Sequence, residues 1–335
     1  MDARRLKRQI GKCLTALANR FPGAKPFVKQ WGLRTSKEWL GNRIVRVQMP
    51  EGKAFKLASA GQNYLSFELF WRGTEYYEPI TTLLLQELAR DGGAFLDVGA
   101  NIGFYSLVLA ASRPAVEVIA FEPNPKNFEL LRQNVRVNRF PQVKCEPLAL
   151  SDVEGTTALY LSASDMSASL ESDFDAHPTA TVRVNTTTLD DYLACHPVAA
   201  DLVVKVDVEG HEESFFRGAR RSATSLKPDF ITEVTFDHGG ETVTFLQDTG
   251  YRFYQITDEG LLEAEELTPV IREPFIFLNY LLSCKPRREV ADLFDRIKAR
   301  VQRIDLTQTS KFVDPAMIQK LRSRRSHSPA KLASE

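Results

Sequence analysis

The sequence predicts an α/β fold: a doubly wound, Rossmann-like sheet with a closing antiparallel hairpin and helical extensions at both ends. Short apolar runs of strand length recur along the chain, at residues 94–98, 116–121, 143–148, 202–206 and 229–234. Segments with helical spacing separate several of these runs, which is the alternation expected of parallel strands joined by helices. The first run leads into FLDVGANIGFYS (residues 95–106), where two glycines bracket a sharp turn from strand to helix.

The helices and entry strands follow from spacing and capping signals. Residues 4–20 predict a short basic amphipathic helix. Residues 128–137 and 189–193 predict two more helices, the second behind a Thr-Leu-Asp-Asp cap. Residues 44–64 predict a β-rich entry segment with the candidate core residues Ile44, Val45, Val47, Phe55 and Leu57.

The second half of the core adds an excursion and a closing pair of strands. Residues 157–161 and 181–184 predict an antiparallel excursion around the polar loop 162–178. Residues 251–256 and 275–282 predict a hairpin-like pair that closes the sheet.

The C-terminal part differs in character from the core. Apolar residues at helical spacing between positions 290 and 304 predict a docked amphipathic helix. Beyond residue 320 the chain is basic and Ser-rich, which predicts disorder. We therefore expect three parts: residues 1–75 as a basic extension, 76–286 as the α/β domain, and 287–335 as a helix and tail.

Composition limits the class of protein. An apolar fraction of 43% and a charged fraction of 26% are those of an ordinary globular protein. The four cysteines, which form no C-x-x-C pair, argue against a zinc cluster and a disulfide framework: Cys13, Cys145, Cys195 and Cys284. No apolar run reaches membrane-spanning length, and the N-terminus lacks a signal-peptide core. We expect a soluble, cytoplasmic protein.

The net charge of zero conceals basic ends and an acidic centre. Residues 1–43 hold 11 Lys and Arg against 2 Asp and Glu, and residues 285–335 hold 13 against 6. The basic helix predicted at residues 4–20 could lie on the inner face of an anionic membrane as a peripheral attachment. Docking on the acidic centre of the same chain is the alternative, and no nucleic-acid partner is expected. Nothing in the sequence decides the oligomeric state.

The turn after the first predicted strand indicates a nucleoside site. Glu122 ends the second strand about twenty residues after the glycines, where an acidic side chain can accept both ribose hydroxyls. Asn101 stands where the dinucleotide fingerprint has its second glycine, and no G-K-[ST] follows, which argues against NAD and ATP. Asp97, before the turn, suits a cationic ligand end such as the amino group of S-adenosylmethionine.

A second polar group follows the fourth predicted strand, in the stretch KVDVEGHE (residues 205–212). Ligands of open α/β sheets bind at the carboxyl ends of the strands, so these side chains are candidates for chemistry. Asp207, Glu209 and His211 could position an acceptor hydroxyl or remove its proton, and Glu233 ends the fifth strand at the same edge. Asp207 and Glu233 could also hold a divalent cation, although the sequence does not require a metal.

These motifs together resemble the FkbM family of S-adenosylmethionine-dependent methyltransferases. The resemblance rests on FLDVGANIGFYS, AFEPNPKNFELLRQNVRVN, ALSDVEG, TTLDDY and VVKVDVEGHE, in that order, and on YYEPITTLLLQEL before them. It covers residues 76–286 and implies an O-methyltransferase on the methyltransferase sheet, acting on a glycan, glycolipid or small-molecule hydroxyl.

The resemblance also implies roles for residues. It places the cofactor against Glu78, Asp97, Gly99, Ala100, Asn101, Gly103, Glu122, Pro123, Asn124, Ser151 and Asp152, with the last two near the adenine. It carries Asp207, Glu209, Gly210 and Glu212 over to the acceptor side. Many family members have a small residue where His211 stands, which leaves its role as a base open.

Other functions stay open at this point. A catalytically silent binding module with the same fold, or an N-methyltransferase acting on a small metabolite, would use the same motifs. His238 follows Glu233 closely and is a candidate to line the pocket. The remaining histidines lie in loops or in the tail and are expected to be bystanders: His177, His196 and His327.

Overall fold

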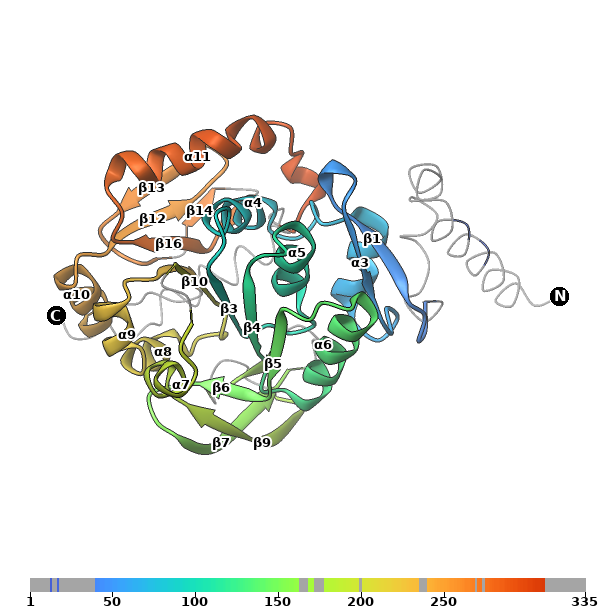
Figure 1. The fold of residues 1–335 in the computed structure, drawn as a ribbon, viewed down its shortest axis with the longest axis horizontal. Coiled ribbons are helices and arrows are strands. Elements are labelled where there is room, and N and C mark those ends of the chain that lie inside the picture. The colour runs from blue at the N-terminus through green and yellow to red at the C-terminus, as the bar shows by residue number, and fades with distance from the viewer. Residues whose placement is uncertain are drawn as a thin grey trace.

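The computed structural model describes residues 40–162, 168–171, 178–198, 201–234, 240–268, 270–272 and 275–310, together with positions 13 and 17. Its centre is an eight-stranded sheet in the order β13-β12-β16-β11-β10-β3-β4-β5 (Figure 1). The bounds of these strands are β3 (Ala94–Val98), β4 (Glu117–Phe121), β5 (Val143–Glu146), β10 (Leu202–Val206), β11 (Asp229–Glu233), β12 (Arg252–Ile256), β13 (Leu261–Ala264) and β16 (Asn279–Ser283). Strands β3, β4, β5, β10 and β11 run parallel, and β16 inserts antiparallel between β11 and β12.

Helices cover both faces of this sheet, so the predicted doubly wound fold is confirmed. One face carries α4 (Pro79–Leu88), α5 (Phe104–Ser112), α6 (Pro125–Asn138) and α11 (Arg287–Val301). The other carries α7 (Leu189–Cys195), α8 (Glu212–Arg217), α9 (Arg220–Ser225) and α10 (Glu241–Asp248). Alternation along the strands feeds both cores: Phe95 and Val203 join the first, and Leu96 and Val204 join the second.

The segment before the sheet joins the first core. β1 (Val45–Gln48) and β2 (Ala54–Leu57) form an antiparallel hairpin around the 3-10 turn η3 (Pro50–Gly52), and α3 (Tyr64–Arg72) follows. Four of the five predicted core residues there are buried, but Ile44 is 48% exposed. Neighbouring strand residues face opposite sides, so burial of Val45 turns Ile44 outward. Helix α3 was not predicted from the sequence.

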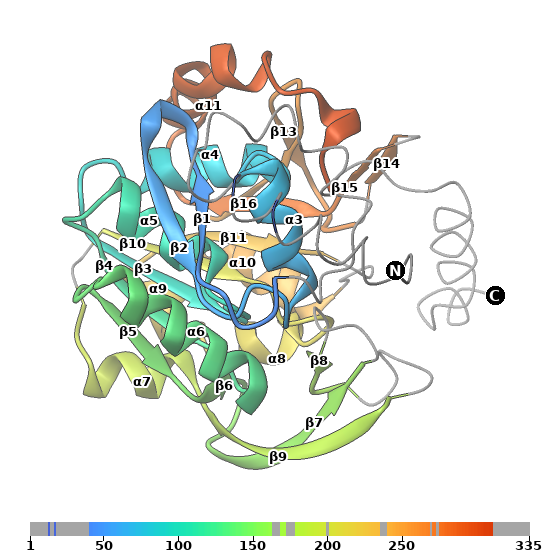
Figure 2. The same ribbon diagram turned by 90° about the vertical axis from the view of Figure 1, so that its right-hand side faces the viewer.

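The predicted antiparallel excursion is confirmed as a second, four-stranded sheet. Its strands are β6 (Leu148–Leu150), β7 (Gly155–Leu161), β8 (Ala168–Ser169) and β9 (Ala180–Thr187), in the order β6-β9-β7-β8. Figures 1 and 2 place this excursion sheet at the end of the molecule away from α11. The prediction of one strand over residues 143–148 is wrong at its end, because Pro147 has no N–H to continue the ladder and β6 leaves the main sheet.

The closing pair of strands is confirmed with a change in its second member. β12 and β16 pair antiparallel, as predicted. The single strand predicted over residues 275–282 is divided, because β15 (Phe275–Phe277) pairs with β14 (Val270–Arg272) and β16 starts two residues later.

The predicted C-terminal helix is confirmed as α11. It docks on α4 through Val290, Leu293, Phe294, Ile297 and Val301, which are buried. A short 3-10 turn, η4 (Leu306–Gln308), follows it. Among the described residues no helix is both long and apolar enough to span a bilayer. Of the helix predicted at residues 4–20, Cys13 and Leu17 are described and are helical, and the other residues lie outside the described ranges, as does the tail beyond residue 320.

Candidate active site

Asp97, near the end of β3, fastens the strand to the helix that follows. Its side chain is 2% exposed, and its Oδ2 accepts hydrogen bonds from the backbone N and the Oγ of Ser106, at 3.0 and 2.6 Å. Ser106 lies in the first turn of α5, where backbone N–H groups lack partners within the helix. Burial raises the pKa of Asp97 to about 6, against the lowering effect of these bonds.

The two glycines of the turn are required by protein neighbours. Gly99 has a φ of +80°, and a Cβ there would lie 1.8 Å from the backbone carbonyl oxygen of Asp207. Gly103 has a φ of +87°, and a Cβ would lie 2.5 Å from Leu131 Cδ1. Gly99 therefore lets the ends of β3 and β10 meet, which brings Asp207 beside the turn.

Glu122, directly after β4, joins the two turns of the predicted nucleoside site. It is 5% exposed; its Oε2 accepts from Asn101 N and its Oε1 from Asn124 N, both at 2.7 Å. Asn124 in turn caps α6 by accepting from Lys126 N at 3.0 Å. Burial raises the pKa of Glu122 to about 7 in spite of the two bonds.

Its immediate neighbours hold the same two turns together. Ala100 N donates to Phe121 O at 2.9 Å, and Pro123 separates Glu122 from Asn124. We call Asp97, Asn101, Glu122 and Asn124 the turn group. Each carboxylate oxygen of Glu122 can accept two hydrogen bonds and accepts one from a backbone N–H. The second acceptor position of each oxygen can take a ligand hydroxyl. The residues present therefore fit a ribose.

Lys205, on β10, is a buried cation that the sequence analysis did not assign to the site. It is 0% exposed, and its Nζ lies 3.4 Å from Asp207 Oδ2 and 5.6 Å from the centroid of the Tyr105 ring. Burial lowers the pKa of Lys205, but Asp207, Glu78 and Glu233 outweigh it, and the net direction is upward. The sequence feature that could have placed Lys205 in the site is its position in KVDVEG, two residues before Asp207 and on the same side of the strand.

Glu78 lies next to this lysine, at the start of α4, and not with the turn group. Its Oε2 accepts from the hydroxyl of Tyr105 at 2.6 Å, and its Oε1 accepts from Asn279 Nδ2 at 2.7 Å. Its φ is +41°, and its backbone N donates to Ser310 Oγ at 3.2 Å. Partners from α5 and β16 thus hold the carboxylate of Glu78, and the chain after α11 holds its backbone.

Four carboxylates gather around Tyr77; we call Glu78, Asp207, Glu209 and Glu233 the carboxylate cluster. Glu233 ends β11 directly opposite Asn279 of β16, one step beyond the β10–β11 pair of Val206 and Thr232. Burial, then Asp207 and Glu78, raise the pKa of Glu233 well above its ordinary value. Tyr77, Asp207, Glu209 and Glu233 each keep partial exposure, so the cluster is open to a ligand.

His211 links the site to the excursion sheet. Its Nε2 lies 2.9 Å from Ser151 Oγ and its Nδ1 lies 2.6 Å from Glu171 Oε1. The hydrogen bond between the two side chains lowers the pKa of Glu171. The excursion also reaches Glu209, whose backbone oxygen accepts from Ser169 Oγ at 2.7 Å. Glu171 was not predicted, since loop position alone gave no signal for it.

The other predicted residues lie around these groups. Asp152, next to Ser151, accepts from Arg217 Nε at 3.0 Å. His196 stacks on Tyr192, with the two ring centroids 4.4 Å apart. His177, His238 and His327 fall outside the described residues. In the described ranges no group of three His, Cys, Asp or Glu side chains is arranged to hold a metal ion.

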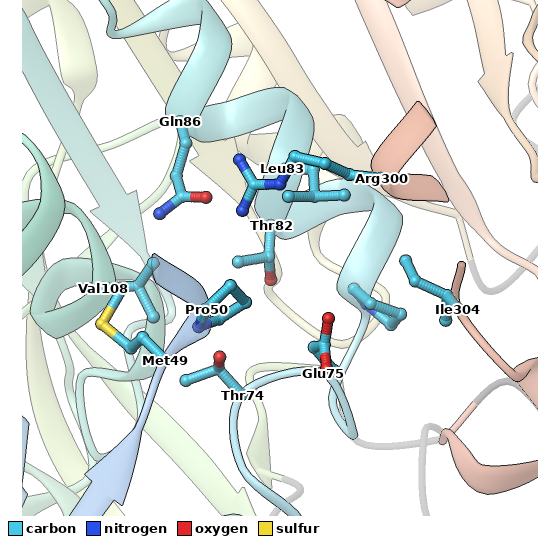
Figure 3. Close-up of a pocket in the computed structure, with 11 residues that line it drawn as sticks. Met49, Pro50, Thr74, Glu75, Thr82, Leu83, Gln86, Val108, Arg300 and Ile304 are labelled. Carbon is cyan, nitrogen blue, oxygen red and sulfur yellow. The ribbon is translucent and has the colours of Figure 1, made fainter. Parts of the chain in front are cut away.

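A separate cavity lies between the N-terminal hairpin, α4 and the end of α11 (Figure 3). Its volume is about 20 Å³, space for about one water molecule. Its lining shares no residue with the turn group or the carboxylate cluster: Met49, Pro50, Thr74, Glu75, Pro79, Thr82, Leu83, Gln86, Val108, Arg300 and Ile304. It is a gap between packed elements, not a second active site.

Comparison with known proteins agrees with the family resemblance. Residues 97–253 match the Methyltransferase FkbM domain. Methyltransferase 1 of Beauveria bassiana is 26% identical over 181 residues, 48% of this chain and 73% of that protein. Hexuronic acid methyltransferase AglP of Haloferax volcanii is 26% identical over 203 residues, 57% of this chain and 77% of that protein.

Two further matches are a curated relative and a solved structure. The 31-O-demethyl-FK506 methyltransferase FkbM of Streptomyces tacrolimicus is 27% identical over 197 residues, 48% of this chain and 74% of that protein. The crystal structure of Methyltransferase FkbM from Methylobacillus flagellatus KT matches with a TM-score of 0.38 and 17% identity, over 58% of this chain and 44% of that one. The domain match and the curated relatives agree with the family resemblance predicted from the sequence, and the chain is a methyltransferase.

Proposed function

We propose that this enzyme transfers a methyl group from S-adenosylmethionine to a hydroxyl of a sugar, glycolipid or related natural product. The observation that carries the proposal is the meeting of the turn group and the carboxylate cluster at one sheet edge, where Gly99 contacts the backbone of Asp207. The names of two relatives, a hexuronic acid methyltransferase and a 31-O-demethyl-FK506 methyltransferase, support acceptors of this class.

The proposed donor site uses the turn group. Glu122 would accept the ribose hydroxyls, Asp97 would face the amino group, and Ser151 with Asp152 would contact the adenine. When bound, S-adenosylmethionine supplies an electrophilic methyl group on a good leaving group. The remaining work, which is to hold the acceptor oxygen in line and take its proton, falls to this chain's residues.

The carboxylate cluster divides that work between two groups. Glu233, whose pKa is raised by burial and by the neighbouring Asp207 and Glu78, ends β11 at the sheet edge, where its side chain can hydrogen-bond to an acceptor oxygen. Asp207 has the positive charge of Lys205 at 3.4 Å and is our candidate for the base. Glu209 lies beside them, and Glu78 joins the acceptor side in place of the cofactor role that the resemblance implied. No step in this proposal runs through a metal.

His211 has a different role in the proposal. Its two ring nitrogens contact Ser151 and Glu171. His211 would therefore position the loop of Ser151 and Asp152, which we call the adenine loop, and would not act as the base. The division into residues 1–75, 76–286 and 287–335 also stays a proposal, with the middle part as the methyltransferase domain.

Calorimetry with S-adenosylmethionine, S-adenosylhomocysteine and NAD tests the donor. We expect both sulfur compounds to bind and NAD to fail; binding of NAD alone would overturn the proposal. Glu122→Ala should weaken the sulfur compounds by about 1.5–3 kcal/mol, the value for hydrogen bonds to a charged group. Release of S-adenosylhomocysteine only with amine acceptors would favour N-methylation, and binding without turnover would favour a silent binding module.

The cellular place proposed for the enzyme is the cytoplasm, with peripheral contact between its basic ends and an anionic membrane. The support is the sequence alone, in the charge of residues 1–43 and 285–335. Sedimentation with anionic liposomes at low salt tests it, with a variant that lacks residues 1–20 as the control. Full-length protein that stays in the supernatant would contradict the contact.

A further inference from the structure

The acceptor side of the site has an excess of negative charge. The described charged side chains that act most strongly on Glu233 are Asp207, Glu78 and Glu209, all carboxylates, and one cation, Lys205. Lys205 is 0% exposed and lies against Asp207 and the Tyr105 ring, so it cannot come forward to meet an anionic ligand. The side chains around Glu233 that keep partial exposure are those of Asp207, Glu209 and Tyr77.

Asn279 supplies an independent sign of a polar ligand in the same place. It is 1% exposed, and its Nδ2 donates to Glu78 Oε1 at 2.7 Å. An ionised carboxylate can only accept, which fixes the amide with its nitrogen toward Glu78. Its Oδ1 has no hydrogen-bond partner within the described part of the chain. Asn279 stands directly opposite Glu233, so this acceptor atom calls for a neutral donor such as a hydroxyl beside the carboxylate cluster.

We propose that the carboxylate cluster selects the acceptor by charge. The pocket takes a neutral or amino sugar, or a similar polyol, whose hydroxyls donate to Asn279 Oδ1 and the cluster carboxylates, with the half-buried Tyr77 ring beside the sugar. It rejects a sugar that carries a carboxylate or phosphate near the methylated hydroxyl, because like charges at close range are unfavourable. A hexuronic acid, which the name of one relative states for that relative, would be a poor acceptor here.

This inference rests on the proposed function and narrows its acceptor. The test uses methyl glycosides of glucose, mannose and galactose, each offered in its neutral, 2-amino and uronic acid form, with methyl transfer from labelled S-adenosylmethionine as the readout. Within a series that is methylated, we expect kcat/KM for the uronic form to fall at least about a hundredfold below the neutral form. Equal or better turnover of the uronic form would overturn the inference.

Variants separate charge from shape. Glu78→Gln keeps the size of the side chain, with an oxygen and a nitrogen beside Tyr105 and Asn279, but removes one negative charge. The ratio of kcat/KM between the neutral and uronic forms should therefore shrink by about tenfold. Glu263→Gln is the matched control: Glu263 pairs with Arg287 at the exposed edge strand β13, and its loss should leave the ratio unchanged. If Glu78→Gln does not fold, Glu233→Gln replaces it.

The outcomes distinguish this inference from the function beneath it. If the ratio of kcat/KM between the neutral and uronic forms is the same in wild type and in Glu78→Gln or Glu233→Gln, selection by charge is overturned. Protein that binds S-adenosylmethionine but methylates none of the glycosides would overturn the acceptor assignment and leave the donor assignment standing. Protein that binds no S-adenosylmethionine would remove the proposed function itself.

Discussion

The turn group and the carboxylate cluster lie at the same sheet edge but are held in different ways. In the turn group, Asp97 accepts from Ser106, 9 residues away, and Glu122 accepts from Asn101 and Asn124, 21 and 2 residues away, mostly from backbone N–H groups. In the carboxylate cluster, Glu78 accepts from Tyr105 and Asn279 side chains, 27 and 201 residues away. One half of the site is made by local turns and the other by tertiary packing.

This difference has an energetic consequence. A backbone N–H in a tight turn remains near its carboxylate as long as the turn exists, so the turn group is preorganised by covalent geometry. The carboxylate cluster concentrates negative charge and depends on Lys205, a cation from β10, to offset it. Substitutions should therefore damage folding most in the cluster and ligand binding most in the turn group.

The largest expected effect is on stability, at Lys205. Lys205→Met keeps the length of the side chain but leaves Asp207 and its neighbours without their buried cation. Breaking a buried ion pair from one side costs about 3–5 kcal/mol in the free energy of unfolding. Urea unfolding followed by circular dichroism measures the loss.

An exposed lysine provides the control for that measurement. Lys144 lies 2.7 Å from Glu146 and is 48% exposed, so Lys144→Met should cost no more than about 1 kcal/mol. Equal losses for the two variants would show that burial and the surrounding carboxylates do not set Lys205 apart.

The next effect concerns the pH dependence of folding through Glu122. Burial raises its pKa from 4.5 to about 7 on folding, so folding favours the protonated form. The stability that this proton contributes is complete below pH 4.5 and is lost as the pH rises through about 7. Over that range, wild-type protein without cofactor should lose on the order of 3 kcal/mol relative to Glu122→Gln, which cannot titrate.

The comparison of two proteins isolates this one group. Asp97 and Glu233 also have raised pKa values, but both proteins contain them, so their effects cancel in the difference. Denaturant titrations at a series of pH values give the two curves. Parallel curves across the whole range would contradict the raised pKa of Glu122.

The contrast in catalysis is sharpest at Asp207. Asp207→Asn keeps the size of the side chain but removes the proposed base, so turnover should fall by about a hundredfold or more. Affinity for S-adenosylmethionine should change by less than about threefold, because the donor is held by the turn group. A matching loss of affinity and turnover would move Asp207 to the donor site.

The same division explains what the sequence could predict. The strands, the glycine turn and Glu122 depend on contacts within about twenty residues, and local patterns reveal such contacts. The doubly wound sheet could be expected from the family resemblance, and the structure confirms it. Lys205 was visible in its motif but not assigned, because a lysine in a strand gives no sign of which carboxylates will surround it.

Residues with distant partners were beyond reach. Asn279 meets Glu78 across 201 positions, and no spacing rule connects the two. The strand break at Leu278 that starts β16, and with it the position of Asn279, depends on pairing with β11 and β12. The cofactor role of Glu78 stays a prediction, and its contacts with α5 and β16 could not be predicted from the sequence for the same reason.

The smallest expected effect, and the one that best separates positioning from chemistry, is at His211. Its ring nitrogens contact Ser151 Oγ at 2.9 Å and Glu171 Oε1 at 2.6 Å, so the imidazole joins the proposed adenine loop to the excursion sheet. His211→Gln should weaken S-adenosylmethionine by about 0.5–1.5 kcal/mol, the value of an ordinary hydrogen bond, and leave kcat within about threefold. Loss of a general base would instead lower kcat by about 10²–10⁴-fold.

Glu171→Gln alone should reproduce the loss of affinity. The double variant should lose less affinity than the two single variants added together, since the two side chains act through one contact. The pH profile of kcat should be the same in wild type and His211→Gln. A changed profile with a large fall in kcat would return His211 to the catalytic group and make Asp207 its partner.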